Sequence, residues 1–436
     1  MIALLAVLVA APAAKAAGPQ AAPARVLTLQ EVQRVALERQ PQLRVAHGTT
    51  QAAEGRVEQF RSPLLPQLSA TADYDRITTN RLYRLGGIQF PAQPTSWSSI
   101  NYYDTAVTLS QLLWDFGQSS NRWRSAQAGA RATADQERTT AQQTVLQVRA
   151  AFFNAVALKE LLAVARETLE NQHNHLAQID EFVKEGTRPP IDLSQARADF
   201  ANAEVQVVNA ENAYQRSKVL LNQAMGVEGS IDYDVASESL PAQPGEDGAL
   251  EPLLQSALAA RPEIAAATEQ VKAQQLLIKS ARGSYAPTIS AVGTVVQSTV
   301  TGSGYVGWDA AVGVTLTWNL FQGGLTNGMI HEAEGNLMSA VGQLDVLRQQ
   351  VRVDVDQALL VIRAAKAAVS SARDALVAAR QRLSLAEGRY QNGSGSVIEL
   401  GDAQIAAAAA AAQVVQTDFQ LSTARAQLLF ALGRQT

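Results

Sequence analysis

The sequence contains no cysteine among its 436 residues. This absence excludes disulfides, thiolate metal sites and cysteine nucleophiles, and we expect any membrane attachment to come from the fold rather than from an acylated cysteine. An excess of one charge is lacking too, because 36 basic and 40 acidic residues are scattered along the chain and give a formal net charge of -4. No basic footprint is present, so we expect no nucleic-acid partner.

Long apolar runs are almost missing. Residues 2–11 are apolar and precede Ala14-Lys15-Ala16, a pattern typical of a secretory signal peptide over 1–17. The usual basic residues before the run are absent, so either the true start lies upstream or the signal is atypical, and a short buried helix is the alternative. Further along, no stretch approaches the roughly 18 to 20 apolar residues of a spanning helix. A mature chain that spans a membrane would therefore use strands.

Motifs for nucleotide binding and hydrolysis are also lacking. Gly302, Gly304 and Gly307 spell G-x-G-x-x-G, but they lie between two expected strands rather than opening a helix, which predicts a loop and not a dinucleotide site. No G-x-S-x-G string is present around any serine. We therefore expect no catalytic residues and no cofactor, and we predict that the protein is not an enzyme.

Histidine is scarce, with four residues in the chain. His173 and His175 lie about 200° apart around a helix and cannot chelate one metal together. His331-Glu332 lacks the second histidine of H-E-x-x-H. The sequence therefore predicts no metal site.

What the sequence does contain is an internal repeat. The segment LQEVQRVALERQPQL in the first half matches LEPLLQSALAARPEI in the second, where Pro41 and Pro262 lie 221 positions apart. From Val107 and Val314 onwards the spacing is 207 positions and stays constant to the last helix. A single break confined to one loop indicates duplication of one structural unit.

We predict a first repeat over 18–235, a linker over 236–248 and a second repeat over 249–436. Each repeat should hold a helix, two strands, a long helix and a shorter helix. The strands are expected where apolar and polar residues alternate, at 64–79, 101–116, 286–299 and 308–321.

The alternation gives each strand one apolar and one polar face, as in Val312, Val314, Leu316, Trp318 and Leu320 against their polar neighbours. The flanking helices are too long to cover such a face compactly, so a transmembrane barrel wall is favoured. Four strands cannot close a barrel, because about eight is the smallest number and open edges are not tolerated in lipid. Several chains must therefore contribute to one barrel.

Aromatic residues gather near the ends of these strands. They suit the girdles at membrane interfaces, although aromatics favour ordinary strands as well. The residues are Tyr102, Tyr103, Trp114, Phe116, Tyr305, Trp308, Trp318 and Phe321.

The helices are expected to be unusually long. Thr28 and Glu31 form a capping-box pattern at the start of the first one. Two runs without proline, 118–185 and 326–391, would each make a helix of about 100 Å at 1.5 Å per residue. Shorter helices, such as those at 28–60 and 191–225, would reach about 50 Å and match a long helix when stacked end to end. This predicts a long antiparallel helical layer.

Several motifs recur in order in both halves: Pro-x-hydrophobic-Ser at Pro66 and Pro287, the segments LLWDFGQ and TWNLFQGG, and the turns EGTRPPIDLSQAR and NGSGSVIELGDAQ. With them the chain resembles the TolC-type outer-membrane efflux proteins over nearly all of its mature length. The resemblance implies a mixed, mainly α fold, in which a homotrimer forms a 12-stranded barrel in outer-membrane lipid that continues into a 12-helix periplasmic tunnel. It also implies a passive exit duct for small molecules or polypeptides, working with a periplasmic adaptor and an inner-membrane pump or exporter in efflux or type I secretion.

The resemblance assigns roles to the two helix-to-helix turns, which lie at the periplasmic tip in the family. The residues that would meet the adaptor are Gly186, Thr187, Arg188, Gly393 and Ser394. Asp192, Glu399 and Asp402 would line the closed entrance, where a ring of carboxylates repeated by three-fold symmetry attracts cations and hinders anions. The alternative for Glu399 and Asp402 is an ordinary helix N-terminus, where the dipole favours carboxylates.

One position departs from the family pattern. Members with a salt-bridge lock place an arginine where this chain has Gly395, and the nearby arginine is Arg188 in the other turn. The remaining alternative is a periplasmic coiled-coil adaptor or another structural protein of an envelope-spanning complex. Adaptors need one helical hairpin flanked by small β-domains, whereas this chain has two hairpins with strands before each.

Overall fold

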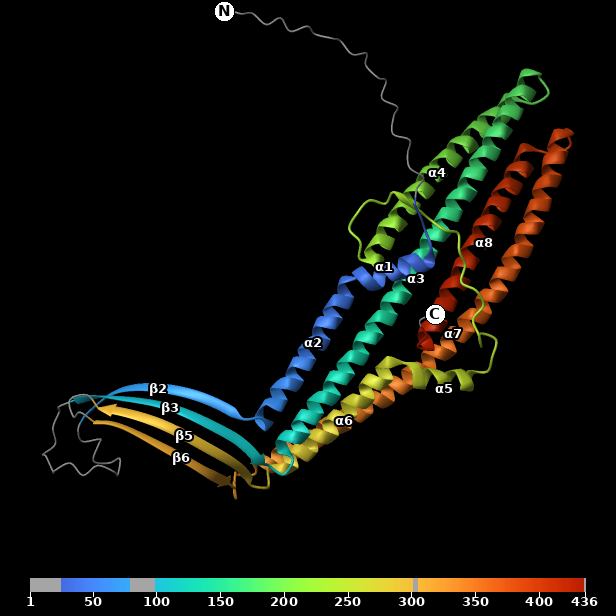
Figure 1. Ribbon diagram of the computed structural model, residues 1–436. Helices are drawn as coiled ribbons and strands as arrows, with labels where there is room; N and C mark the ends of the chain where they lie inside the picture. The colour runs from blue at the N-terminus through green and yellow to red at the C-terminus, as the bar shows by residue number, and fades with distance from the viewer. Residues whose placement is uncertain (1–24, 79–98, 301–304, 435–436) are drawn as a thin grey trace, which may run out of the picture. The chain divides into compact units, whose positions relative to one another are not determined.

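The computed structural model describes residues 25–78, 99–300 and 305–434. The signal peptide expected at 1–17, together with Gly302 and Gly304, lies outside these residues. The described elements follow in the order β1 Arg25–Leu27, α1 Leu29–Arg39, α2 Pro41–Arg61, a 3-10 turn Ser62–Leu64, β2 Gln67–Thr78, β3 Ser99–Trp114, α3 Gln118–Lys184, α4 Pro190–Met225, β4 Tyr233–Val235, α5 Leu250–Ala260, α6 Pro262–Gly283, β5 Thr288–Val300, β6 Tyr305–Thr317, α7 Leu325–Gln391 and α8 Val397–Ala431 (Figure 1).

The chain divides into two compact units, and each takes segments from both halves of the sequence. The hairpin unit comprises the described parts of 1–38, 148–240 and 369–422, and the sheet unit comprises those of 39–147, 241–368 and 423–436. Helices α3 and α7 have 67 residues each and contribute to both units. The proline-free runs therefore do form single uninterrupted helices, as their composition predicted.

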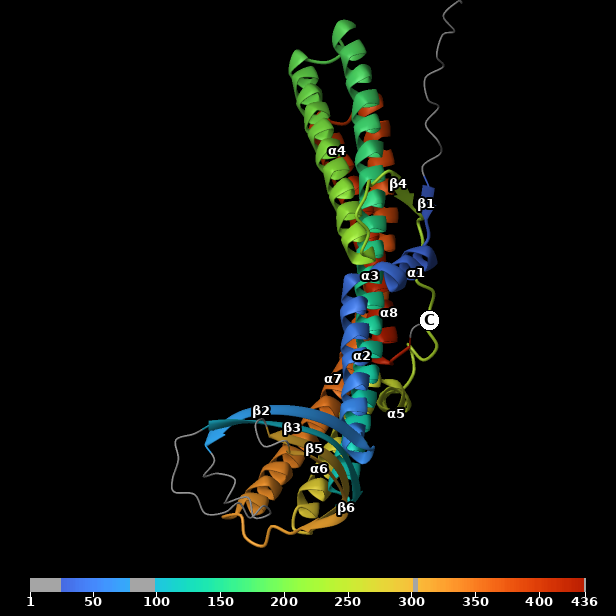
Figure 2. The ribbon, with the colours of Figure 1, turned by 60° about the vertical axis from the view of Figure 1, so that its left-hand side comes forward.

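The sheet unit is named for its four-stranded antiparallel sheet, in the order β2-β3-β5-β6. The strands bend together into one curved sheet (Figures 1 and 2). One row across it joins Leu68, Leu109, Gly293 and Val312 as direct neighbours. Strands β2 and β6 form the two edges, and neither has a second partner strand among the described residues.

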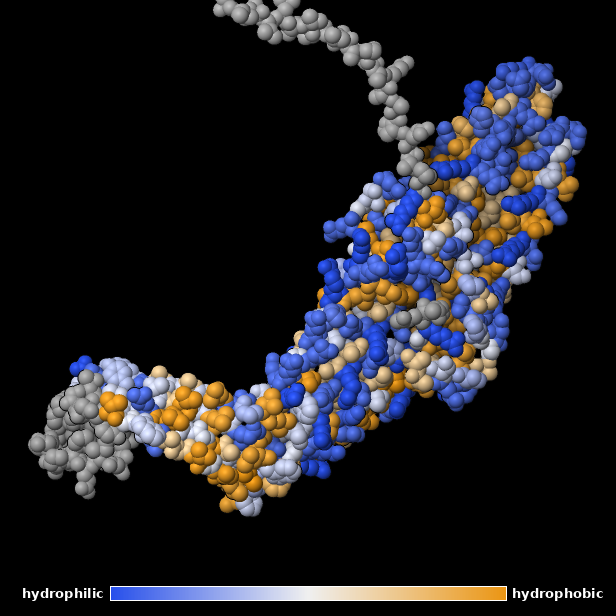
Figure 3. Space-filling model, in the orientation of Figure 1, coloured by the Kyte–Doolittle hydropathy of each residue, from blue (hydrophilic) through white to orange (hydrophobic). Residues whose placement is uncertain are grey.

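The two faces of this sheet differ as the alternation predicted. Apolar side chains such as Leu109 and Val312 are exposed, Val312 to 92%, and apolar residues spread over the visible face of the strands in Figure 3. Polar side chains on the other face bond across strands, where Ser298 Oγ donates to Asp104 Oδ1 at 2.7 Å. Strand β6 ends at Thr317, so Trp318 and Leu320 lie beyond the strand on which the sequence placed them. The alternation continued past the point where pairing with β5 stops.

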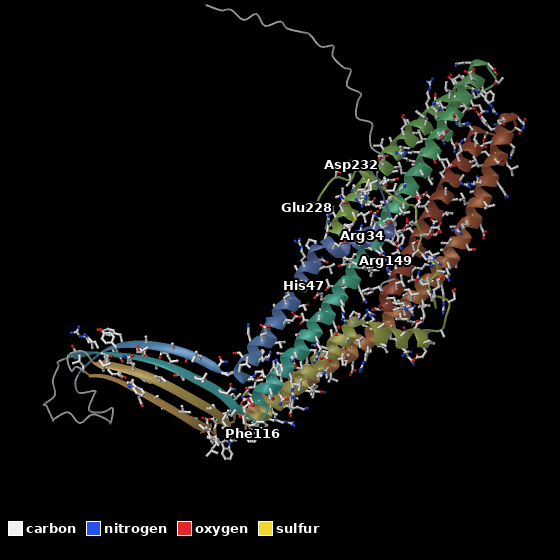
Figure 4. All side chains as sticks on the ribbon, in the orientation of Figure 1. Arg34, His47, Phe116, Arg149, Glu228 and Asp232 are labelled. Atoms are coloured by element: carbon white, nitrogen blue, oxygen red, sulfur yellow. The ribbon has the colours of Figure 1, made fainter. Side chains whose placement is uncertain are left out.

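Between β3 and α3 the chain makes a tight turn with two residues in the left-handed region. Phe116, labelled in Figure 4, has φ 55 and Gly117 has φ 86. The Asp115 carboxylate caps the helix that follows, because it accepts hydrogen bonds from the amides of Gly117 at 3.1 Å and Ser119 at 2.6 Å. The turn redirects the chain from the sheet into α3.

The helix expected over 28–60 is wrong as a single element, because it is broken into α1 and α2. Thr28 Oγ1 accepts the amide of Glu31 at 3.3 Å, as the capping box predicted. The break falls at Gln40, which has extended backbone angles (φ -61, ψ 121) before Pro41. Arg261 before Pro262 breaks the second half in the same way. The cause is the steric restriction that proline imposes on its predecessor.

Helix α2 is held on α3 by a polar cluster in the sheet unit. His47 Nδ1, on α2 (Figure 4), lies 3.2 Å from Glu137 Oε1 on α3. Thr50 Oγ1 donates to the other oxygen of Glu137 at 2.6 Å. Glu137 is thus held by two residues one helical turn apart, which fixes the register of α2 on α3.

Left-handed backbone positions recur at one spacing in the two halves. Glycine adopts this conformation without the steric cost that other residues incur. Residues 207 positions apart share the left-handed conformation in four pairs: Phe116 and Gly323, Gly117 and Gly324, Gly186 and Gly393, and Gly226 and Gly433.

The segment between the halves is tied down in each unit. In the hairpin unit β4 pairs in parallel with β1, and Asp234 accepts hydrogen bonds from Lys159 at 2.7 Å and Tyr214 at 2.5 Å. In the sheet unit, buried Glu246 binds Arg425 at 3.1 Å and Lys366 at 2.7 Å. The predicted linker and the strand just before it are therefore an ordered, ion-paired segment, which we call the strap (233–248), and no sequence pattern predicts the β1-β4 pair.

Each unit has its own apolar core. In the hairpin unit it consists of Ile179, Ala196, Ala386, Tyr390, Leu400 and Ala403. In the sheet unit it is larger, and its members include Leu253, Val355, Leu359, Ile362, Leu428 and Leu432. None of the helices in the described part of the chain has the length and apolar character needed to cross a membrane.

Candidate functional site

The two helix-to-helix turns of the hairpin unit have the same local backbone. We call 185–189 the first turn, between α3 and α4, and 392–396 the second turn, between α7 and α8. Gly186 (φ 73) and Gly393 (φ 74) occupy the left-handed position of each. The following amides close the turns, from Thr187 to the Phe182 carbonyl and from Ser394 to the Arg389 carbonyl, both at 3.0 Å. This is the helix-ending pattern for which glycine is favoured.

Arg188 connects the two turns. Its Nη2 donates to the carbonyl oxygen of Tyr390 at 2.9 Å and lies 3.5 Å from that of Gly395. The guanidinium carbon also lies 4.4 Å from the centre of the Tyr390 ring, which is a cation-π contact. The side chain of one turn therefore holds the backbone of the other within a single chain.

Gly395 has a local reason to be glycine. A Cβ at this position would lie 3.0 Å from the Tyr390 amide nitrogen and 3.2 Å from the Arg389 carbonyl carbon. Both of these are backbone atoms, which cannot rotate away as a side chain can. A larger residue such as arginine would therefore distort the second turn, and Arg188 supplies a guanidinium from the opposite side.

Tyr390 is the centre of this arrangement, with 1% of its surface exposed. Its ring lies 5.5 Å from that of His175 and 6.5 Å from that of Phe182. Burial raises the pKa of the Tyr390 hydroxyl, the Arg188 charge lowers it, and Asp192 raises it. The hydroxyl makes no hydrogen bond to the described residues. The aromatic ring, rather than the hydroxyl, is therefore the part of Tyr390 that binds its neighbours.

The three carboxylates predicted for the entrance have different surroundings. Asp192 is buried in the first turn of α4. Glu399 accepts a hydrogen bond from Arg389 Nη1 at 2.8 Å, and its amide is capped by Ser396 Oγ at 3.1 Å. Asp402 is exposed on α8. No hydrogen bond or ion pair among the described residues joins Asp192 to either of the other two. Glu399 thus fits the helix-terminus interpretation, with a partner that partly neutralises it.

Tyr390 and Arg389 were not predicted from the sequence, and His175 was considered only as a metal ligand. A signal existed for Arg389, because a basic residue at the end of one helix and an acidic one at the start of the next often pair across a short turn. The two neighbouring histidines do point apart, as their spacing predicted: His173 lies against Phe200 and His175 against Tyr390. Over residues 25–78, 99–300 and 305–434, no three His, Asp or Glu side chains are placed to hold a metal ion.

Comparison with known proteins gives the family. The family model described as outer membrane efflux protein matches twice, at residues 32–227 and 253–434. Outer membrane efflux protein BepC of Brucella suis is 28% identical over 76% of this chain and 72% of its own length. Protein CyaE of Bordetella pertussis is 28% identical over 94% of this chain and 85% of its length. Outer membrane protein TolC of Escherichia coli is 24% identical, covering 83% and 73%.

Solved structures show the same fold. The outer membrane protein VceC of Vibrio cholerae superposes with a TM-score of 0.79 at 17% identity, covering 93% of this chain and 96% of that one. A membrane protein from Pseudomonas aeruginosa gives 0.79 at 22% identity, covering 93% and 90%. At such identities the likeness establishes the fold alone.

The chain belongs to the outer membrane efflux protein family, whose model covers most of its length. It is the outer-membrane channel component of an efflux or secretion system, located in the outer membrane of a Gram-negative cell. The family is one of transport channels rather than of enzymes. This membership decides against the periplasmic adaptor considered as the alternative.

Proposed function

We propose that three copies of this chain form one passive, non-enzymatic exit duct, with twelve strands closed into a barrel in outer-membrane lipid and the helices forming a periplasmic tunnel. The observation that carries the proposal is the four-stranded sheet, which has an exposed apolar face and two edges that pair with no other strand of the described residues. Unpaired strand edges are too costly in lipid, where no water can satisfy them.

Pairing between neighbouring copies would supply hydrogen-bond partners for the backbone groups at these edges. In the order β2-β3-β5-β6, neighbouring strands alternate in direction, so β6 of one copy would meet β2 of the next in antiparallel fashion. Four strands are fewer than the roughly eight of the smallest barrels. The number three follows from the family resemblance. Lipid would cover the exposed apolar face, and the polar face with Asp104 and Ser298 would line the water-filled interior.

We further propose that 18–235 and 249–436 are two copies of one ancestral unit joined by 236–248. The paired left-handed positions at a spacing of 207 support this, as does a family model that matches once in each half.

The turns are proposed as the periplasmic end of the duct. Gly186, Thr187, Gly393 and Ser394 are exposed and would meet a periplasmic adaptor, which links the duct to an inner-membrane pump or exporter. Arg188 would act on that surface indirectly, since its guanidinium is engaged with the second turn. The cargo would be small molecules or polypeptides, driven by the partner pump.

Asp192, Glu399 and Asp402 are proposed to line the entrance. Because Glu399 is paired with Arg389 and Asp402 is exposed, Asp402 should contribute most to ion preference. In planar bilayers, Asp402→Asn should reduce cation preference more than Glu399→Gln. Glu204→Gln, an exposed site further along α4, is the control and should have no effect. Unchanged conductance and selectivity in Asp402→Asn would remove this residue from the entrance.

The assembly can be tested without background labelling, because the chain has no cysteine. One variant carries two cysteines, one on β2 at Ser69 or Thr71 and one on β6 at Ala311 or Thr315. Oxidation should link β6 of one copy to β2 of the next in outer-membrane fractions, which gives products of two and three chains. A cysteine at Thr294 in β5, which has neighbours on both sides, replaces the β6 cysteine as the control and should give none. A protein that stays monomeric and stable in buffer without detergent would refute the duct.

A further inference from the structure

His175 is a buried titratable residue for which the channel function gives no role. It lies on α3 in the hairpin unit with 9% of its surface exposed. Its ring stands edge-on to Tyr390, with 5.5 Å between ring centres and 66° between planes. None of the hydrogen bonds among the described residues involves its imidazole. The neighbouring Gln172 binds Gln404 of α8 at 3.0 Å, so α3, α7 and α8 meet around the histidine.

The charged groups around His175 come from several elements. On α4, Asp199 acts directly on His175, and Asp192 acts on Tyr390. From the first turn, the Arg188 guanidinium lies on the Tyr390 ring. On α7 the group packed against the histidine is Tyr390 itself, and on α8 it is the neutral Gln404. Protonated His175 would thus be a second cation on an aromatic ring that already binds one.

Burial lowers the pKa of His175 below its usual 6.5, and Asp199 offsets part of this effect. The folded state therefore binds the proton less readily than an open state in which the ring is hydrated. Above about pH 6.5 the two states bind equally few protons, so the closed packing is at full strength. As the pH falls below that value, the open state takes up protons first and becomes favoured.

We propose that His175 is an acid-sensitive element that couples protonation to release of the second turn from α3. Neutral imidazole packs against Tyr390, and the backbone carbonyl of that tyrosine is the acceptor for Arg188. When the imidazole is charged, its ring moves toward water, Tyr390 loses its support and the Arg188 bond is strained. This release would also widen the entrance of the duct, and that consequence rests on the proposed function. The loosening of the second turn does not depend on it.

The test measures hydrogen exchange of residues 389–396 in the purified full-length protein in detergent. The unmodified protein and each variant are compared at the same pH. After correction for intrinsic exchange, the unmodified protein should exchange about threefold or more faster at pH 5.5 than at pH 7.5. His175→Phe keeps an aromatic ring without a titratable group and should abolish this response. His173→Phe, two residues away and packed on Phe200, should retain it.

Direct titration protects the test against a misfolded variant. Because the chain has four histidines, selective labelling and single substitutions assign the His175 signal by NMR. A pKa at or above the usual value, or an equal acid response in His175→Phe, would overturn the proposal. Conductance is measured separately, so a protein that loosens in acid but does not conduct refutes the duct and keeps the switch.

Discussion

Arg188 in the first turn donates a hydrogen bond of 2.9 Å to the backbone carbonyl of Tyr390, 202 positions further along the chain. The bond makes one helical hairpin support the turn of the other. The bond itself requires only a backbone carbonyl at position 390, whereas the stacking contact requires the Tyr390 ring as well. The arginine must provide both a donor and a planar cation, so it cannot be replaced freely.

Replacing this arginine should loosen the second turn. Arg188→Ala removes a charged hydrogen bond and a cation-π contact, and we expect a local loss of about 1 to 3 kcal/mol. Exchange of the amides at 392–396 should rise, and Arg188→Lys should rescue it only in part because an ammonium cannot reproduce the planar stacking. The exposed Arg197 on α4 provides the control, and Arg197→Ala should leave the exchange unchanged. Equal protection in Arg188→Ala would contradict the role given to this bond.

The glycine in the second turn should be intolerant of even one methyl group. Gly395→Ala places a Cβ 3.0 Å from the Tyr390 amide nitrogen, so the thermal unfolding temperature should fall. At Gly388 on α7 an added Cβ meets nothing within 4 Å. Gly388→Ala should therefore be neutral or raise stability by about 0.5 to 1 kcal/mol, as expected inside a helix. If both variants melted alike, close backbone approach would not explain Gly395.

The two faces of the sheet should respond differently to a charge. Val312→Asp puts a carboxylate on the exposed apolar face and should destabilise the membrane-inserted form, by less than the roughly 2 to 4 kcal/mol that a basic residue costs at the middle of the bilayer. We expect smaller amounts of the assembled oligomer in outer-membrane extracts, measured as an SDS-resistant species that dissociates on heating. Thr294→Asp, on the polar face beside Thr108, should be accepted. Normal assembly of Val312→Asp would mean that this face does not meet lipid.

Acid should weaken the strap in the sheet unit through Glu246. Burial raises the pKa of this carboxyl, but hydrogen bonds from Arg425, the Gln243 amide and Lys366 outweigh burial and lower the pKa to about 2. Above pH 4.5 the contribution is complete; as the pH falls from 4.5 towards 2, the unfolded chain takes up the proton first and stability is lost.

Glu246→Gln should therefore lower the melting temperature at pH 7 and flatten its decline between about pH 4.5 and 3. Glu251→Gln, on the exposed side of α5, is the matched control and should keep the decline of the unmodified protein. A Glu246→Gln protein with an unaltered acid profile would show that the ion pair does not contribute.

Much of this fold could be predicted because its signals are local. Apolar and polar residues that alternate with a period of two indicated β2, β3, β5 and β6, and long runs without proline indicated α3 and α7. The breaks before Pro41 and Pro262 were also encoded locally and could have been predicted from the restriction on the preceding residue. The end of β6 could not be predicted from alternation, because it depends on where β5 stops pairing.

The site was predictable in position but not in its contacts. Gly186 and Gly393 marked both turns, since glycine is favoured in the left-handed region. The crossing of Arg188 to Tyr390 depends on how two hairpins register against each other, and no sequence spacing encodes that. The three-residue strands β1 and β4 are equally silent, because each is too short for a pattern and its partner is 208 positions away.

The matched left-handed positions in the two halves have a consequence for how such a chain can diverge. Within one polypeptide the two versions of a turn are free to specialise, one donating a side chain and the other offering bare backbone, as Arg188 and Gly395 do. In the proposed three-copy assembly, a single substitution would then alter three of six related turns rather than all six. Because the two halves are fused, the ring of turns alternates between turns that donate a side chain and turns that offer backbone carbonyls, instead of consisting of six identical turns.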